Sequence, residues 1–258
     1  MTSLVVIPTY NERDNIADLV VRVLEQGDTL DVLVVDDNSP DGTGDIADRL
    51  AAANPKRVHV LHRSGRLGLG TAYITGFQYG LAKGYDYLFE MDADFSHDPS
   101  YLPLFLEKMG EGYDVVIGSR NIKGGGVRNW PLARRILSRG GSLYARAILG
   151  LGVTDATGGF KCFRRQVLES LNLDSIRSNG YSFQIEVNYR CQQLGFRIAE
   201  IPIVFTDRVK GGSKMSKGIV LEAMVVVWKL KLEPLFGRIN EVRSGRNIKL
   251  KAVEPDRR

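Results

Sequence analysis

Two aspartates in the first half of the chain have the type and spacing of a metal site. Asp92 and Asp94 are separated only by Ala93 and follow the largely apolar run at residues 87–91, which we expect to be a buried strand. Residues i and i+2 of an extended segment point to the same side, so both carboxylates would face one way. Neighbouring carboxylates raise each other's pKa unless a cation lies between them, and Mg²⁺ resolves this conflict while taking phosphate oxygens as further ligands. The alternative is a loop in which an aspartate caps the next helix.

The charges are divided unevenly along the chain. Residues 1–116 contain 9 Lys and Arg against 19 Asp and Glu, whereas residues 117–258 contain 26 against 11. An acidic half suits a metal ion, and a basic half suits a phosphate, a nucleic acid or an acidic membrane surface. Nucleic acid is not expected as a partner, because no recognition motif is present and aromatic residues are not interleaved with the basic ones.

The composition is that of a globular protein, with 43% hydrophobic and 25% charged residues. Cys162 and Cys191 form neither a metal-binding spacing nor a disulfide framework, so a reducing compartment is expected. The first expected strand begins at Leu4, which leaves no room for a signal peptide. No run reaches the roughly 18–20 apolar residues of a membrane span. Residues 219–228 are apolar around Glu222 and predict either a core helix or a segment lying against a membrane or partner helix.

Apolar strands and helices alternate over the first 120 residues. Strands are expected at residues 4–8, 31–35, 58–61, 87–91 and 115–118, and helices at about 11–26, 43–53, 69–83 and 100–109, the first of them capped by Asn11. This alternation predicts an α/β fold with a mostly parallel sheet covered on both faces. Ligands of such sheets bind at the carboxyl ends of the strands, which selects four loops at residues 8–12, 36–43, 92–97 and 119–126.

The second half is less regular, and we expect helices at residues 131–149 and 182–194, a strand at 197–205 and a flexible basic loop at 208–217. We predict one domain over residues 1–236, with a nucleotide- and metal-binding half at 1–119 and an acceptor- and membrane-facing half at 120–236. A basic, polar tail at residues 237–258 is expected to be disordered.

Six motifs occur in a characteristic order. They are PTYNE (8–12), VDDNSPDGT (35–43), DADFSH (92–97), GSR (118–120), ATGGFK (156–161) and DRVKGGSK (207–214). This series resembles the family 2 glycosyltransferases of the Rossmann-like GT-A fold, and within them the dolichyl- and polyprenyl-phosphate mannose synthases. The resemblance covers roughly residues 3–230.

The resemblance implies an activity. Such an enzyme would transfer mannose from GDP-mannose to polyprenyl (dolichyl-type) phosphate with inversion, using Mg²⁺ or Mn²⁺, on the cytoplasmic face of a membrane. It would bind the membrane surface by itself or through a membrane-anchoring partner protein. Two alternatives remain: the same reaction with UDP-glucose, and a non-catalytic module that binds a sugar nucleotide.

The resemblance also implies roles for individual residues. The donor would contact Pro8, Tyr10, Glu12, Val35, Asp37, Asp92, Ala93, Asp94, Ser96, Arg120, Arg208 and Lys214. The metal ion would be held by Asp92, Asp94 and Ser96, although some relatives carry Gln at the position of Ser96. The acceptor phosphate would contact Arg120, Arg134 and Ser138, and the catalytic residues would be Asp94 and Arg120.

The residues themselves agree with a phosphate acceptor. Arg134 and Ser138 are four positions apart and would share one helix face, where both could contact a phosphate. Alternatively, this face of the helix is simply exposed to solvent. Of the three histidines only His97 is near the proposed site, where we expect it to orient the metal loop rather than to act as a general base. A phosphate monoester has a second pKa near ~6, so at neutral pH it is mostly dianionic and can attack a sugar without a base.

Overall fold

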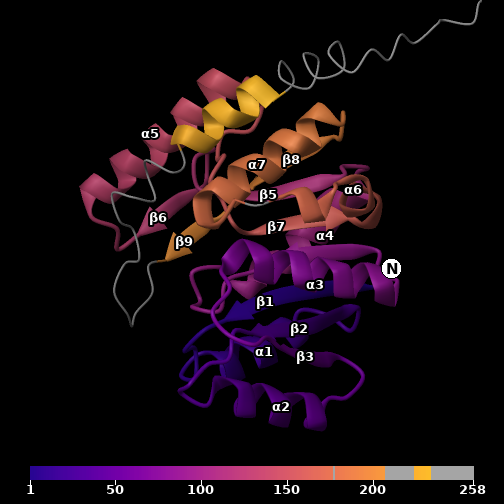
Figure 1. Ribbon diagram of the computed structural model, residues 1–258. Coiled ribbons are helices and arrows are strands. Elements are labelled where there is room, and N and C mark those ends of the chain that lie inside the picture. Colours follow the sequence, from indigo (N-terminus) through magenta and orange to yellow (C-terminus); the bar gives the residue numbers. More distant parts are fainter. Residues whose placement is uncertain (177, 207–223, 234–258) are drawn as a thin grey trace, which may run out of the picture.

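Two neighbouring strands, β1 (Ser3–Thr9) and β4 (Tyr87–Glu90), form the centre of a seven-stranded sheet. The computed structural model describes residues 1–176, 178–206 and 224–233 (Figure 1). The strand order is β3-β2-β1-β4-β7-β5-β8. β7 runs antiparallel to both of its neighbours, and every other pair in this sheet is parallel. The remaining strands are β2 (Leu30–Asp36), β3 (Val58–His62), β5 (Val115–Ser119), β7 (Lys161–Arg164) and β8 (Ile198–Pro202).

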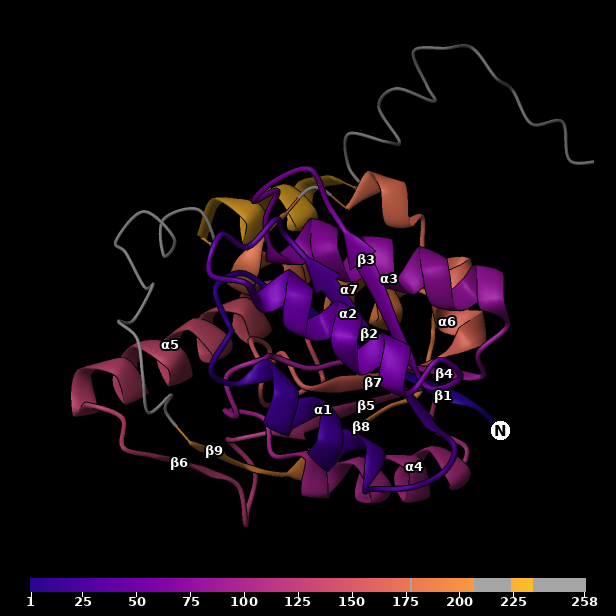
Figure 2. The ribbon, with the colours of Figure 1, turned by 90° about the horizontal axis from the view of Figure 1, so that it is seen from below.

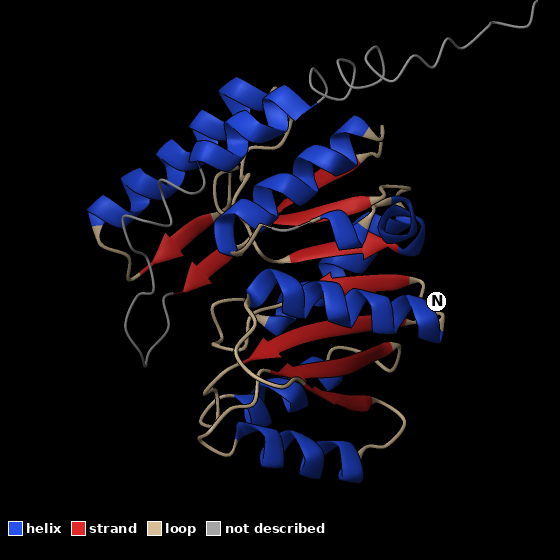
Figure 3. Ribbon diagram, in the orientation of Figure 1, coloured by secondary structure: helices blue, strands red, loops and turns tan. Residues whose placement is uncertain are grey.

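The chain leaves β1 toward β2 and β3 and then returns to β4 on the other side of β1. Loops on the two sides of such a switch point diverge and leave a crevice at the carboxyl ends of the strands. The strands are apolar on both faces, so helices must cover both (Figures 2 and 3). One face packs on α1 (Ile16–Leu24), α2 (Thr43–Ala53) and α4 (Leu102–Gly110), and the other on α3 (Leu69–Lys83), α6 (Arg165–Ser170) and α7 (Gly180–Gln193).

Helix α3 lies unusually close to the sheet. A Cβ atom at Gly76 would lie 2.3 Å from Cγ1 of Val6, and one at Gly80 would lie 2.3 Å from Cδ2 of Leu88. Only glycine permits this approach, which fixes the N-terminal end of α3 at the crevice. The helix ends at Gly84, whose φ of 88° is left-handed, as the sequence predicts.

The second half of the chain adds a smaller layer. β6 (Gly126–Arg128) and β9 (Val204–Thr206) pair in parallel as a separate two-stranded sheet, next to the long helix α5 (Leu132–Leu149). Residues 224–233 are helical and share a core with the C-terminal part of α5. Two 3₁₀ turns, η1 (Pro99–Tyr101) and η2 (Leu173–Ser175), complete the described elements. None of the described helices is both long enough and apolar enough to cross a membrane.

Three sequence expectations need correction. Helix α1 begins at Ile16 rather than at residue 11, because Asn11 has a left-handed φ of 60° and its amide donates to Ser39 in the next loop. The strand expected at residues 197–205 is two strands, β8 and β9, which belong to different sheets. β7 was not predicted at all, because it carries a lysine, Lys161, that is buried in the core. The predicted loop at 208–217 and tail at 237–258 lie outside the described residues.

Candidate active site

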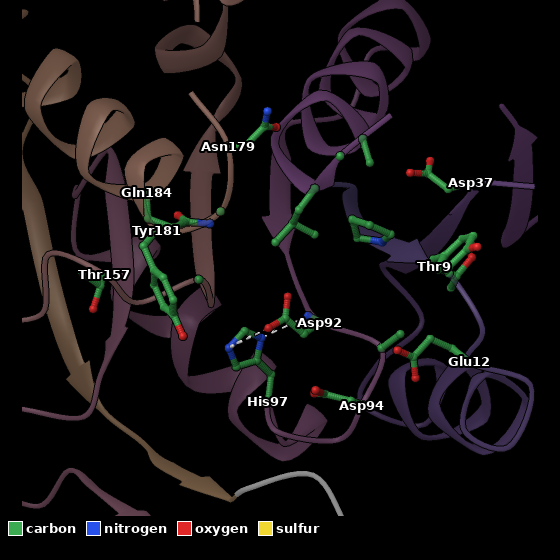
Figure 4. Close-up of a pocket in the computed structure, with 18 of the residues that line it drawn as sticks. Thr9, Glu12, Asp37, Asp92, Asp94, His97, Thr157, Asn179, Tyr181 and Gln184 are labelled. Carbon is green, nitrogen blue, oxygen red and sulfur yellow. Dashed lines mark hydrogen bonds and ion pairs between the residues drawn. The ribbon is translucent and has the colours of Figure 1, made fainter. Parts of the chain in front are cut away.

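A cavity of about 400 Å³ opens at the carboxyl ends of the central strands (Figure 4). This volume lies within the range that holds small-molecule ligands. The predicted site residues that line it are Pro8, Tyr10, Glu12, Asp37, Asp92, Ala93, Asp94, Arg120 and Arg134. They come from four separate loops and from α5, so the structure brings together what the sequence separates by more than 120 positions.

One end of the cavity offers an aromatic ring and fixed carboxylates. Arg63 Nε donates to Asp37 Oδ1 at 2.5 Å, and the amide of Leu67 donates to Asp37 Oδ2 at 3.1 Å, so both oxygens of Asp37 are held. The guanidinium of Arg66 lies 4.8 Å from the centroid of the Tyr10 ring. Glu12 lies on the same side of the cavity as Asp37. An aromatic face beside oriented acceptors suits a nucleoside, whose base stacks and whose N–H and O–H groups donate.

The aspartate pair follows β4 directly, and its first member is held on two sides. The hydroxyl of Tyr73 donates to Asp92 Oδ1 at 3.1 Å, and the amide of Asp92 donates to His97 Nδ1 at 3.0 Å. The ring of His97 is buried and stacks on Phe160 at 4.9 Å. Burial lowers the pKa of His97 below its ordinary value, although the negative charges of Asp92 and Asp94 act to raise it. Because Nδ1 already accepts the Asp92 amide, this ring is poorly suited to act as a base. Its expected role in orienting the metal loop stays a prediction.

Asp94 is held by the loop that follows it. Ser96 donates to Asp94 Oδ1 through its amide at 3.1 Å and its hydroxyl at 2.5 Å. The Ser96 side chain is buried and does not line the cavity, so its role as a third metal ligand stays a prediction.

The donor set at the cavity fits a hard divalent ion. Within the described part of the chain, no group of three or more His, Cys, Asp or Glu side chains is arranged around a metal position. Asp92 and Asp94 both line the cavity, however, and two carboxylates suit Mg²⁺ or Mn²⁺ that takes its other ligands from phosphates.

A buried cation lies at the end of β5. Arg120 is 6% exposed, and its Nε and one terminal nitrogen each donate to Asp155 at 2.7 Å, while that nitrogen also donates to Thr157 Oγ1 at 2.9 Å. Burial by itself lowers the pKa of Arg120, but the charge and hydrogen bonds of Asp155 outweigh it and hold the pKa above its ordinary value. The amides of Thr154 and Asp155 in turn donate to Glu200 of β8 at 2.7 and 2.9 Å. The guanidinium is therefore permanently charged and rigidly placed.

A second arginine reaches the same wall from α5. The guanidinium of Arg134 lies 4.1 Å from the Trp130 ring centroid, and that of Arg120 lies 5.6 Å from the same ring. Ser138 is half-buried one turn further along α5 and does not line the cavity. Val35 is buried in the core below the cavity. Arg208 and Lys214 lie outside the described residues.

Sequence reasoning missed the wall of the cavity that faces Glu12 and Asp37. Asn179, Tyr181 and Gln184, at the N-terminal end of α7, line the cavity together with Thr157 (Figure 4). The predicted helix began two residues too late, at 182, which hid the helix start. An Asn-Gly pair before an expected helix was the available signal, since such residues commonly mark a loop that leads into a helix.

The arrangement can be compared with known proteins. The family model described as glycosyl transferase family 2 matches residues 4–171, which include the aspartate pair, Arg120 and Asp155. The chain belongs to this family. It is 48% identical over 243 residues to a polyprenol monophosphomannose synthase of Mycolicibacterium smegmatis, covering 93% of this chain and 90% of that protein. It is 52% identical over 227 residues to an undecaprenyl-phosphate mannosyltransferase of Micrococcus luteus, covering 88% and 93%.

A solved structure shares the fold. Glucosyl-3-phosphoglycerate synthase from Mycobacterium tuberculosis, in complex with Mn²⁺, UDP-glucose and phosphoglyceric acid, superposes with a TM-score of 0.66. The match covers 89% of this chain and 79% of that one at 21% sequence identity. The expected α/β fold of the GT-A type is thereby confirmed.

Proposed function

We propose that this glycosyltransferase moves mannose from GDP-mannose to a polyprenyl phosphate, giving polyprenyl β-mannosyl phosphate and GDP. The mannosyltransferase names of its relatives at about 50% identity support the sugar and the acceptor. The feature of the site that carries the proposal is the pair Arg120 and Arg134, which flank Trp130 in one wall of the cavity. Two guanidinium groups beside a single site suit a phosphate dianion. Arg120 would contribute its other terminal nitrogen, because Nε and the first terminal nitrogen are held by Asp155 and Thr157.

The described residues of the cavity include no histidine placed to act as a base, which agrees with this acceptor. His97 is the histidine that lines the cavity, and its Nδ1 accepts the Asp92 amide. A sugar hydroxyl would need such a base, whereas a phosphate dianion has no proton to lose. Its oxygen attacks C1 of mannose, the bond from C1 to the diphosphate breaks, and GDP leaves. One in-line displacement inverts the α-linked donor to a β-mannosyl phosphate.

The chain's own residues would divide the work along the cavity. Tyr10, Glu12 and Asp37 would bind the nucleoside, and Asp92 and Asp94 would hold Mg²⁺ or Mn²⁺ against the diphosphate. The metal would supply positive charge to the leaving diphosphate. Arg120 would add fixed positive charge between the two phosphate groups, in a site where burial strengthens electrostatic interactions.

The membrane that carries the lipid acceptor would lie against α5. Leu132, Ile136 and Leu143 fall on one stripe of this helix and are 71%, 64% and 65% exposed. Val225 and Trp228 add further exposed apolar surface on the neighbouring helical segment. Exposed apolar residues with arginine among them, here Arg139, are typical of a helix that lies at a membrane surface. This surface supports our proposal that the protein binds a membrane, and we further propose the cytoplasmic face as the site of binding, either directly or with a membrane-anchoring partner.

The test is sugar transfer to polyprenyl phosphate in detergent or liposomes, with GDP-mannose and UDP-glucose in parallel, each with Mg²⁺ and with EDTA. We expect chelator-sensitive transfer from GDP-mannose alone. Transfer from UDP-glucose alone would contradict the proposed donor. Binding of a sugar nucleotide without any transfer, in the presence of membranes, would instead indicate a non-catalytic binding module.

A further inference from the structure

Two ionisable side chains, one acidic and one basic, are buried beneath the cavity. Glu90 on β4 and Lys161 on β7 are partners in the antiparallel register, and both side chains are fully buried. Burying an ammonium group is costly unless it finds hydrogen-bond acceptors. Lys161 Nζ finds two on one residue of α7, because it donates to the backbone oxygen of Gln184 at 3.3 Å and also to Gln184 Oε1.

This contact determines which way the Gln184 amide points. An ammonium group can only donate, so the amide atom that faces Lys161 must be the oxygen. Nε2 then lies on the opposite side of the Cγ–Cδ bond axis, pointing away from Lys161. It carries two hydrogens, so its proximity to Glu90 still leaves one donor for another partner. Gln184 lines the cavity, and its buried position leaves the amide little freedom to rotate.

The space next to this donor is kept open by a glycine. A Cβ atom on Gly159 would lie 3.5 Å from Gln184 Nε2 and 3.6 Å from Cε1 of His97. All three residues line the cavity. The backbone of Gly159 is not in the left-handed region, so its turn does not require glycine. What the missing side chain provides is room between an oriented N–H donor and a histidine ring.

The position of this space along the cavity identifies what fills it. Gln184, Tyr181 and Thr157 lie on one side, Glu12 and Asp37 lie on the other, and Asp92 lies between them (Figure 4). With the nucleoside at Glu12 and Asp37 and the diphosphate at the aspartates, the next group along the donor is the hexose. Resting on the proposed function, we infer that Gln184 recognises the hexose, with Nε2 donating to a sugar hydroxyl in the space that Gly159 leaves free.

Two substitutions test this assignment by different routes. Gln184→Leu removes the donor but also removes an acceptor of Lys161, so its effect on folding must be measured. Gly159→Ala leaves the network under the cavity intact and adds one methyl group at ordinary contact distances. Gly152→Ala is the matched control, because a Cβ there would meet a glutamine oxygen at 3.6 Å, in a loop that does not line the cavity.

The readout is the dissociation constant of GDP-mannose and of GDP, each measured by calorimetry with Mg²⁺ on wild type and variants. The loss of one hydrogen bond predicts that GDP-mannose binds about tenfold more weakly to Gln184→Leu and Gly159→Ala. GDP, which lacks the hexose, should bind as it does to wild type, and Gly152→Ala should bind both normally. Equal weakening of both ligands would place Gln184 at a phosphate and overturn the inference, and so would no weakening of either. A wild-type chain that binds GDP but not GDP-mannose would overturn the proposed donor itself.

Discussion

Arg120 and Asp155 face each other through two parallel hydrogen bonds of 2.7 Å in the wall of the cavity, and Asp155 also accepts the amide of Arg120 at 3.0 Å. Asp155 is fully buried and follows β5 by more than thirty residues in the chain. Asp155 therefore has two effects on Arg120. It compensates the buried positive charge, which stabilises the fold, and it fixes the direction in which the remaining N–H groups of the guanidinium point.

Asp155→Ala should destabilise the protein strongly. The substitution leaves the Arg120 guanidinium buried without its counter-charge, and breaking a buried ion pair in this way costs about 3–5 kcal/mol. Urea denaturation followed by circular dichroism measures the free energy of unfolding. Asp45→Ala, which removes an exposed carboxylate from the first turn of α2, is the control and should cost under about 1 kcal/mol. Equal stability of the two variants would contradict the importance assigned to the pair.

Asp94→Ala should abolish metal-dependent transfer while leaving the fold intact. Asp94 is half-buried on a loop rather than in the core, and it accepts hydrogen bonds from Ser96 of the same loop. The loss of one of two carboxylates should weaken Mn²⁺ binding by at least about tenfold. Even a residue that only supports a metal ligand typically contributes this much to metal affinity, and a ligand itself contributes more. Titration of Mn²⁺ in the presence of GDP, alongside the transfer assay, measures both effects.

The control for this variant is Asp98→Ala, in the same loop. Asp98 is exposed, does not line the cavity, and caps η1 by accepting the Ser100 amide at 2.9 Å. It should keep Mn²⁺ binding and transfer at the wild-type level and lose only about 1 kcal/mol of stability. Wild-type activity in Asp94→Ala would refute the metal site.

Much of the structure of residues 1–119 could be predicted because its signals are local. Helix α3 spans Leu69–Lys83 and ends at Gly84, as expected, since its apolar spacing and its terminal glycine are both encoded within fifteen residues. The rule that ligands bind at the carboxyl ends of parallel strands then selected loops that do line the cavity. The family resemblance drawn from the motifs is confirmed by the family match.

What could not be predicted depends on contacts between distant segments. Residues 11–13 looked like a helix start, but their amides donate to side chains of the loop after β2, which holds them in the site instead. β7 was missed because a strand containing Lys161 does not look buried until Glu90 and Gln184 are placed beside it. The α7 wall of the cavity was missed for a local reason as well, because the predicted helix began at residue 182 rather than at Gly180, and only the folded chain brings this helix start to the cavity.

Arg134→Ala should weaken the acceptor far more than the donor. Arg134 lines the cavity from α5 beside Trp130, on the side where the lipid phosphate is proposed to bind. Loss of a charged hydrogen-bond donor to phosphate predicts that the KM for polyprenyl phosphate rises by roughly tenfold or more. The dissociation constant of GDP-mannose should change by less than about twofold.

The matched control for Arg134 is its neighbour. Arg135 is exposed and donates to the backbone oxygen of Val127 at 3.4 Å, and it does not line the cavity. Arg135→Ala should leave both constants near their wild-type values. If Arg134→Ala weakened donor and acceptor equally, the acceptor assignment would be wrong.

Ile136→Glu should detach the protein from membranes without disabling its chemistry. Ile136 is exposed on the apolar stripe of α5, away from the cavity, so the substitution costs no packing in the core. Burial of such a side chain contributes about 1.5–3 kcal/mol, so replacing it by a charge should lower partitioning onto anionic vesicles by at least about tenfold. Co-sedimentation with vesicles containing acidic lipid measures the partitioning.

Leu194→Glu is the control, since Leu194 is 52% exposed at the end of α7, outside the stripe, and should keep wild-type binding. Transfer to an acceptor dissolved in detergent should survive in both variants, and wild-type vesicle binding by Ile136→Glu would show that α5 does not face the membrane.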